Sequence, residues 1–205
     1  NELTEVLSST SAWQMVLCVG IIAPIIEELF FRKLLIDRLY RYGELAAILI
    51  SGLLFGLFHQ NFNQFFYAAG IGIVFGFVYC RTGSYRLVVL LHMAFNMVMG
   101  VLPSLVSEKV IAFLELIENT PFENIISSLD TIIPEYGLSL LLYGIHILAS
   151  NALNVVGIIL LIINLRKTRF NYGTTMLCAA EKRKCALVNA GMITIIIVLT
   201  LFMLL

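Results

Sequence analysis

The sequence is poor in charged residues. They make up only 13% of its 205 residues, whereas a soluble globular domain has about a quarter. The 13 Lys and Arg balance the 13 Asp and Glu, so the net charge is zero, and no basic cluster is long enough to form a nucleic-acid-binding arm. Nucleic acids and other polyanions are therefore not the expected partners.

Cysteine is also scarce and widely spaced. Cys18, Cys80, Cys178 and Cys185 form no Cys-x-x-Cys pair, so neither a disulfide framework nor a metal knuckle is indicated. No charged segment followed by a short apolar stretch and a small-residue cleavage site opens the chain. Because the first residue is Asn1 rather than Met, we expect that upstream residues are missing.

Hydrophobic residues are abundant and make up 60% of the chain. A helix needs about 20 apolar residues to cross a bilayer. A soluble all-α protein is the alternative for the shorter apolar stretches, but the last two are too long and uniformly apolar for it. The sequence therefore predicts an all-α, polytopic transmembrane helical bundle in a single membrane domain (residues 1–205), with about six spans: Ala12–Ile36, Leu45–His59, Phe65–Cys80, Leu87–Leu102, Leu138–Leu165 and Cys185–Leu205.

The basic residues predict the orientation, because Lys and Arg concentrate on the cytoplasmic side. The connection between the fourth and fifth spans (residues 103–134) has Lys109 as its only base, and we expect it to form interfacial helices on the extracytoplasmic side. Both ends of the sequence then lie outside. The bases around the loops after the first, third and fifth spans all lie on the opposite, cytoplasmic side: Lys33, Arg38, Arg41, Arg81, Arg86, Arg166, Lys167, Arg169, Lys182, Arg183 and Lys184.

Several polar side chains lie within or at the ends of these apolar spans. Such residues are costly in a membrane, and each is a candidate functional residue. Counting along each helix places the polar groups of the first four spans near mid-membrane, with His92 closer to the basic side. The polar residues are Glu27, Glu28, Arg32, His59, His92, Asn96 and His146.

The first polar cluster contains two adjacent glutamates. Glu28 and Arg32 are four residues apart and share one helix face, where they can pair. Glu27 lies about 100° further around the helix and lacks that partner, which leaves it free to act as a general base. A cluster of charges at the membrane boundary, with Arg32 and Lys33 reaching toward water, is the alternative interpretation.

Two further pairs have the same spacing of four residues. Phe55 and His59 share one helix face, and His92 and Asn96 share another. The second pair can donate hydrogen bonds to a developing oxyanion. Structural hydrogen bonds between helices are the alternative for both pairs.

Taken in order, these residues resemble the CAAX-protease and bacteriocin-processing (CPBP, or Abi) family of intramembrane peptidases, which includes the prenyl-protein endopeptidases. The family pattern is EExxxR, then FxxxH, then HxxxN or HxxxB on successive core helices. The match covers residues 21–100, which the resemblance marks as the catalytic core. The chain has Glu27-Glu28-xxx-Arg32, Phe55-xxx-His59 and His92-xxx-Asn96.

The resemblance implies hydrolysis of a peptide bond within the membrane. Glu27, with His59, would activate the attacking water. His92 and Asn96 would stabilise the oxyanion. The supporting residues would be Glu28, Arg32 and Phe55.

The family is also described as metallopeptidases, and a zinc site would use Glu27, His59 and His92. The chain has no HExxH motif, and these ligands would come from three helices. We therefore favour a glutamate-activated water without a cofactor, with zinc as the alternative.

Two features depart from the family pattern. Family members typically have about eight spans, so six predicts either missing N-terminal helices or a shortened form. His146 belongs to none of the motifs, and we expect it to form a hydrogen bond between helices.

The leading hypothesis is an endopeptidase of the bacterial plasma membrane that cleaves a peptide or lipid-modified protein, with its active site open toward the cytoplasm. A non-catalytic bacteriocin self-immunity or membrane scaffold protein is the alternative. A transporter is a third hypothesis, although the sequence shows no inverted repeat. The sequence identifies neither the substrate nor the oligomeric state.

Overall fold

A computed structural model describes residues 11–165, 168–174, 178–187 and 190–204. Within these residues the chain forms helices and no strand. The predicted cytoplasmic bases Arg166 and Lys167 lie outside the described residues.

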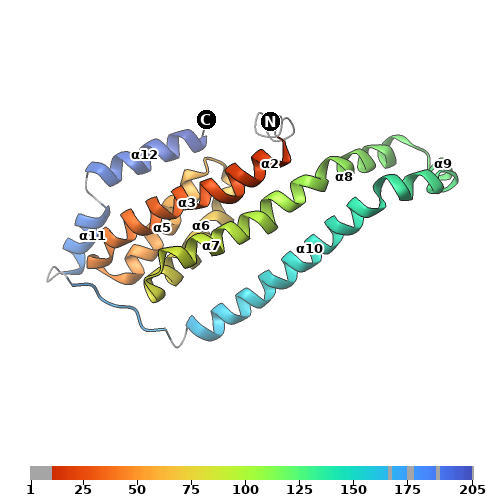
Figure 1. The fold of residues 1–205 in the computed structure, drawn as a ribbon. Helices are drawn as coiled ribbons and strands as arrows, with labels where there is room; N and C mark the ends of the chain where they lie inside the picture. Colours follow the sequence, from red (N-terminus) through yellow and green to blue (C-terminus); the bar gives the residue numbers. More distant parts are fainter. Residues whose placement is uncertain (1–10, 166–167, 175–177, 188–189, 205) are drawn as a thin grey trace. The chain divides into compact units, whose positions relative to one another are not determined.

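The first long helix runs from Ala12 to Tyr42 and changes its hydrogen-bonding pattern along its length (Figure 1). π-Helical turns are rare and occur mostly at functional sites, and the Glu-Glu-xxx-Arg motif lies where α3 passes into η2. The parts of this helix are α2 (Ala12–Met15), the π-helix η1 (Val16–Ile22), α3 (Ala23–Glu28), the π-helix η2 (Leu29–Ile36), α4 (Asp37–Leu39) and the 3₁₀ turn η3 (Tyr40–Tyr42).

The second and third helices, α5 (Glu44–Phe58) and α6 (Phe62–Thr82), form a tight hairpin. The Asn61 side chain accepts hydrogen bonds from the N–H groups of Asn63 and Gln64, and so caps the start of α6. The largest buried apolar side chains of this region come from η2, α5 and α6: Ile36, Ile48, Phe55 and Phe75.

The next helix runs unbroken from Tyr85 to Asn119 through α7 (Tyr85–Asn96), the π-helix η4 (Met97–Val101) and α8 (Leu102–Asn119). We expected the fourth span to end at Leu102, because Pro103 follows. The structure instead carries the helix through Pro103, which is the second residue of α8 and follows the π-helix η4. Whether residues 103–134 lie outside the bilayer stays a prediction.

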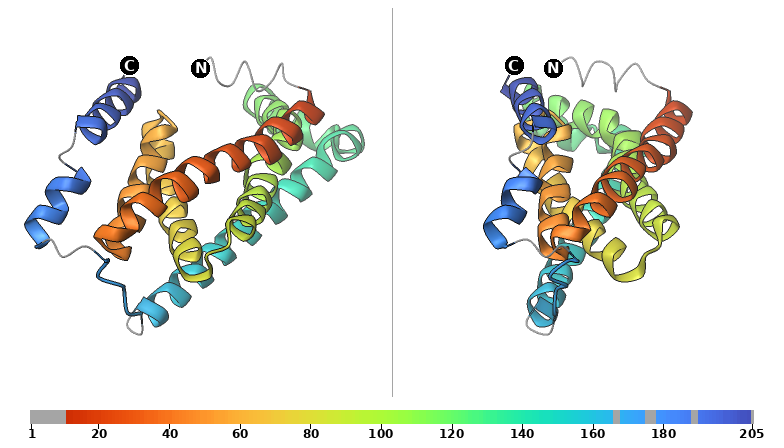
Figure 2. Two further views of the ribbon diagram at one scale, coloured as in Figure 1. Left: turned by 60° about the vertical axis from the view of Figure 1, so that its left-hand side comes forward. Right: turned by 90° about the vertical axis from the view of Figure 1, so that its left-hand side faces the viewer.

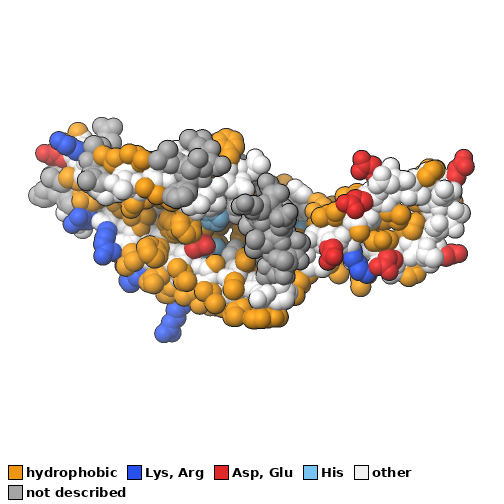
Figure 3. Space-filling model, turned by 90° about the horizontal axis from the view of Figure 1, so that it is seen from above, with side chains coloured by type: hydrophobic (Ala, Val, Ile, Leu, Met, Phe, Trp, Pro, Cys, Tyr) orange, Lys and Arg blue, Asp and Glu red, His pale blue; other side chains and the backbone are white. Residues whose placement is uncertain are grey.

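After the short α9 (Phe122–Ser127), the 37-residue α10 (Leu129–Leu165) returns alongside α8 (Figures 1 and 2). Lys109 of α8 pairs with Glu135 of α10, with Nζ 3.1 Å from Oε1. Figure 3 shows acidic side chains gathered at the α9 end of these helices. The exposed acids of this segment are Glu108, Glu115, Glu118, Glu123, Asp130 and Glu135.

Four helices of the described residues are long and apolar enough to cross a membrane, or five if the bent pair α11 (Ala179–Leu187) and α12 (Ala190–Leu204) is one span. The predicted all-α, polytopic architecture is confirmed. Full-length spans are fewer than the six expected, because α5 has only 15 residues and the last apolar stretch is bent by 58°.

The chain divides into two compact units. One comprises Asn1–Ala23 and Met93–Thr168, and the other comprises Pro24–His92 and Arg169–Leu205. The second unit, called the motif unit below, contains every predicted site residue except Asn96 and His146. That residues 1–205 act as one membrane domain stays a prediction.

Candidate active site

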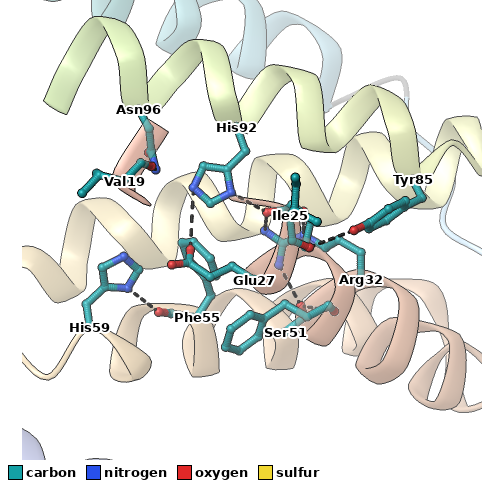
Figure 4. A network of polar contacts seen from close by, with 12 residues as sticks. Val19, Ile25, Glu27, Arg32, Ser51, Phe55, His59, Tyr85, His92 and Asn96 are labelled. Carbon is teal, nitrogen blue, oxygen red and sulfur yellow. Dashed lines mark hydrogen bonds and ion pairs between the residues drawn. The ribbon is translucent and has the colours of Figure 1, made fainter. Parts of the chain in front are cut away.

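Glu28 and Arg32 form a fully buried ion pair in the motif unit, one helical turn apart (Figure 4). Arg32 Nε lies 2.8 Å from Glu28 Oε2, and Nη2 donates to Oε1 at 3.1 Å. The second contact is a hydrogen bond, and the first is a close ion pair without hydrogen-bond geometry. The predicted pairing is confirmed.

Ser51 of α5 holds the other side of the guanidinium. Arg32 Nη1 donates to Ser51 Oγ at 3.2 Å, and that hydroxyl donates to the Phe31 carbonyl at 2.9 Å. Ser51 is fully buried. The arginine is therefore held from both sides through Nη1 and Nη2, two donors that would be costly to bury alone.

His92 is held by the same carboxylate. Its Nδ1 lies 2.9 Å from Glu28 Oε1, and because an ionised carboxylate only accepts, Nδ1 carries the hydrogen. Its other nitrogen, Nε2, then faces Glu27, with 3.7 Å between Nε2 and Glu27 Oε2. A carboxylate that holds one ring nitrogen orients the other for chemistry.

Glu27 has a different environment from Glu28. Its Oε2 is buried and has no hydrogen bond from a described residue, and the 3.7 Å to His92 is too long for one. The side chain is 16% exposed, compared with 0% for Glu28. Of the two glutamates, Glu27 is the one whose carboxylate is free to bind another group.

His59 ends α5 and is half-buried. Its Nδ1 lies 2.8 Å from the Phe55 carbonyl, which only accepts, so Nδ1 carries the hydrogen and Nε2 is left as a base. Figure 4 shows its ring on the same side of the site as Glu27, with which it interacts electrostatically.

Phe55 lies among the polar groups of the motif unit. Its ring centroid is 4.9 Å from that of His59 and 5.6 Å from that of His92. Arg32 Cζ lies over the same ring at 5.1 Å. The aromatic ring thus contacts the guanidinium of Arg32 and both imidazoles.

Asn96 lies in the other unit, one turn beyond His92 along the helix. Its Nδ2 donates to the Val19 carbonyl at 2.9 Å. Its predicted role beside His92 at an oxyanion stays a prediction.

His146 is on α10, outside the motif unit. Its ring is tilted against Tyr143, with 6.4 Å between centroids. Among the residues that the structure describes, it forms no hydrogen bond, so the expected bond between helices is not found there.

The described residues contain no group of three His, Cys, Asp or Glu side chains placed to hold a metal ion. Glu27, His59 and His92 therefore do not form a ready zinc site in this arrangement.

Two contributors to the site were not predicted. Ser51 precedes Phe55 and His59 at the same spacing of four residues, so the α5 pattern contained the signal for it. Tyr85 donates its hydroxyl to the Ile25 carbonyl at 2.8 Å. No sequence pattern indicates this contact, because the two residues are 60 positions apart.

Comparison with known proteins agrees with the motifs. Residues 9–98 match the family described as type II CAAX prenyl endopeptidase Rce1-like. YdiL of Bacillus subtilis (strain 168), which is named as a membrane peptidase, is 31% identical over 83 residues, 40% of this chain and 34% of YdiL. The membrane-embedded CAAX protease MroQ of Staphylococcus aureus (strain USA300) is 29% identical over 85 residues, 38% of this chain and 34% of MroQ.

These matches confirm the resemblance that the motifs indicate. The matched segment spans about a third of the length of both relatives. No solved structure matches the chain.

Proposed function

We propose that this chain, whose residues 9–98 match the Rce1-like CAAX prenyl endopeptidases, is an integral membrane endopeptidase that cleaves a membrane-associated peptide or lipid-modified protein. One observation carries the proposal. Glu28 Oε1 accepts hydrogen bonds from Arg32 and His92, while Glu27 Oε2 has no hydrogen bond from a described residue.

In the proposed reaction, Glu27 activates water. The attacking water would bind at Glu27 Oε2, which has no hydrogen bond from a described residue, and His92 Nε2 is left for the substrate oxygen. Glu27, assisted by His59, takes a proton as the water oxygen attacks the scissile carbonyl carbon. The C–N bond then breaks, and the proton passes to the leaving nitrogen, which gives a carboxylate and an amine.

His92 stabilises the negative charge that develops on the carbonyl oxygen. When protonated, the ring keeps its Nδ1 hydrogen on Glu28 and presents its Nε2 hydrogen to the oxyanion. The paired carboxylate orients the ring, as in hydrolases where a carboxylate orients a histidine. Asn96 is proposed as a second donor. No step is assigned to a metal ion, because three converging ligands are not found among the described residues.

The proposed substrate approaches from the cytoplasmic side. This orientation rests on the basic residues of the loops after the first and third spans and on the acidic segment around α9. The chemistry of the site requires a peptide bond and does not by itself require a prenyl group.

The test uses the purified protein in detergent with fluorogenic peptides that carry a C-terminal CAAX sequence, with and without a prenyl group. The Glu27→Gln variant keeps the shape of the side chain and loses the base, so we expect the cleavage rate to fall about 10²–10⁴-fold. Glu115→Gln, an exposed acid on α8, is the matched control and should cleave normally. Equal turnover by wild type and Glu27→Gln would contradict the proposal.

A further inference from the structure

The first helix contains a proline where its backbone hydrogen bonds need a donor. The N–H of Ala23 bonds the carbonyl of Cys18, five residues earlier, in the register of the π-helix η1. The next N–H in this register belongs to residue 24 and would bond the Val19 carbonyl. Residue 24 is proline, which has no N–H. The Val19 carbonyl is therefore left without its partner within the helix.

The membrane makes such a carbonyl costly. In the hydrocarbon region no water is present to satisfy it, and neighbouring side chains must do so. The Val19 side chain is 36% exposed, so this face of the helix is not shielded by the protein. A donor from another helix is needed there.

Asn96 supplies that donor. Its Nδ2 lies 2.9 Å from the Val19 carbonyl oxygen (Figure 4), within the normal range for an N–H···O bond. The two residues are 77 positions apart in the sequence, so the contact joins the helix that begins at Ala12 to the helix that begins at Tyr85. Gly20, next to Val19, faces Met97, next to Asn96, so closely that a Cβ at position 20 would collide with the Met97 side chain.

We propose that Asn96 is a positioning residue that replaces the N–H missing at Pro24, and so fixes the first helix at Val19, eight residues before Glu27. The role does not exclude the oxyanion contact, because the amide nitrogen has a second hydrogen and Val19 accepts only one. The His92-xxx-Asn96 motif then has two roles: His92 takes part in the proposed reaction, and Asn96 holds the backbone of the neighbouring helix. It holds whether or not the chain is a peptidase.

The test is a double-mutant cycle read by thermal unfolding in detergent. Asn96→Ala should lower the melting temperature by about 2–4 °C, the shift expected for loss of one such bond in a chain of this size. In the Pro24→Ala background residue 24 has its own N–H for the Val19 carbonyl. There Asn96→Ala should cause less than half of that loss.

Pro134→Ala provides the matched control, because it restores an N–H inside α10, far along the chain from Val19. The loss caused by Asn96→Ala should be unchanged in that background. An equal loss in the wild-type and Pro24→Ala backgrounds would overturn the proposal and assign Asn96 a role unrelated to the proline.

Asn96→Asp is the second variant, since a carboxylate keeps the size of the side chain and cannot donate. It should lose as much stability as Asn96→Ala, and full stability would also overturn the proposal. If Asn96→Ala does not accumulate as folded protein, recovery of folded protein in Pro24→Ala/Asn96→Ala supports the proposal, and failure to recover it contradicts it. Because the readout is stability, absence of peptidase activity leaves the result intact.

Discussion

Glu27 and Glu28 lie in different surroundings although a single peptide bond joins them. Glu28 is fully buried and accepts hydrogen bonds from Arg32 and His92. Glu27 faces His92 without such a bond. The difference follows from the rotation of about 100° between successive residues of a helix. One carboxylate supports the site and the other is available for chemistry.

This division predicts that Glu28→Gln destabilises the protein much more than Glu27→Gln does. Glu28→Gln removes the negative charge beside the buried Arg32, and an unpaired buried charge costs about 3–5 kcal/mol. Glu27→Gln removes only the 3.7 Å contact with His92 Nε2, so we expect its free energy of unfolding to stay within about 1 kcal/mol of wild type. Denaturant unfolding of the purified variants measures both values. Similar destabilisation by the two substitutions would be inconsistent with the division.

For single residues, the sequence predicted the contacts within one helix and not those between helices. Glu28 and Arg32 are four residues apart, and helical spacing alone brings them together. The bond from His92 to Glu28 joins residues 64 positions apart. It depends on how α7 packs within the motif unit, which the spacing of residues along one helix does not encode. The shared carboxylate could therefore not be predicted from the motifs.

Among the helices, the close approach of α5 and α6 is made by glycine. A Cβ on Gly72 would lie 3.0 Å from the Cα of Gly52 and 3.0 Å from the Cβ of Phe55. Small residues allow membrane helices to pack closely in this way. Because Phe55 contacts both imidazoles, the glycine contact also sets the position of that ring.

We expect Gly72→Ala to destabilise the protein by about 1–3 kcal/mol, since an added methyl in a tight contact forces the helices apart. Gly70→Ala is the control on the same helix. A Cβ there meets nothing within 4 Å, and its stability should be unchanged or slightly raised. Thermal unfolding of the two variants compares them directly, and equal losses would refute the role of the Gly72 contact.

The sequence of α6 contains three closely spaced glycines, Gly70, Gly72 and Gly76, and their spacing alone does not distinguish them. The three differ in their neighbours: Gly72 contacts Gly52, Gly76 lies near Ile36 and Ile48, and Gly70 is open. The sequence predicted the apolar stretches as helices, because hydrophobicity alone selects them. The π-helices and the helix through Pro103 depend on local hydrogen bonding and were not predicted.

Over the whole chain, the two sequence segments of the motif unit are joined by polar contacts. Glu44, fully buried at the start of α5, has Oε1 3.1 Å from Arg81 Nε, and its Oε2 accepts from the Asn171 N–H at 2.9 Å. The Glu44 N–H in turn donates to the Asn171 carbonyl at 2.9 Å. Arg81 also donates to the Arg169 carbonyl and lies over the ring of Phe170. Residues 168–174 are thus fastened to the start of α5 and the end of α6.

Arg81→Ala should release this segment. The variant loses the Glu44 ion pair, the bond to the Arg169 carbonyl and the cation–π contacts, while the hydrogen bonds of Asn171 to Glu44 and Tyr40 remain. We expect amide hydrogen exchange of residues 168–174 to rise about tenfold or more, equivalent to about 1.4 kcal/mol of lost local stability. Arg86→Ala replaces an exposed arginine with no contact among the described residues and should leave the exchange unchanged. Unaltered exchange in Arg81→Ala would contradict the role of Arg81 in holding this segment.

Burial of the Glu28–Arg32 pair has a further consequence, for the response of the protein to salt. The pairs Lys33–Asp37 and Lys109–Glu135 have side chains about half exposed, and dissolved ions weaken such pairs. Screening acts over about 8 Å at physiological ionic strength and is much weaker for buried charges. A change in the ionic strength of the surroundings therefore weakens or strengthens the surface pairs and leaves the carboxylate that orients His92 unaffected.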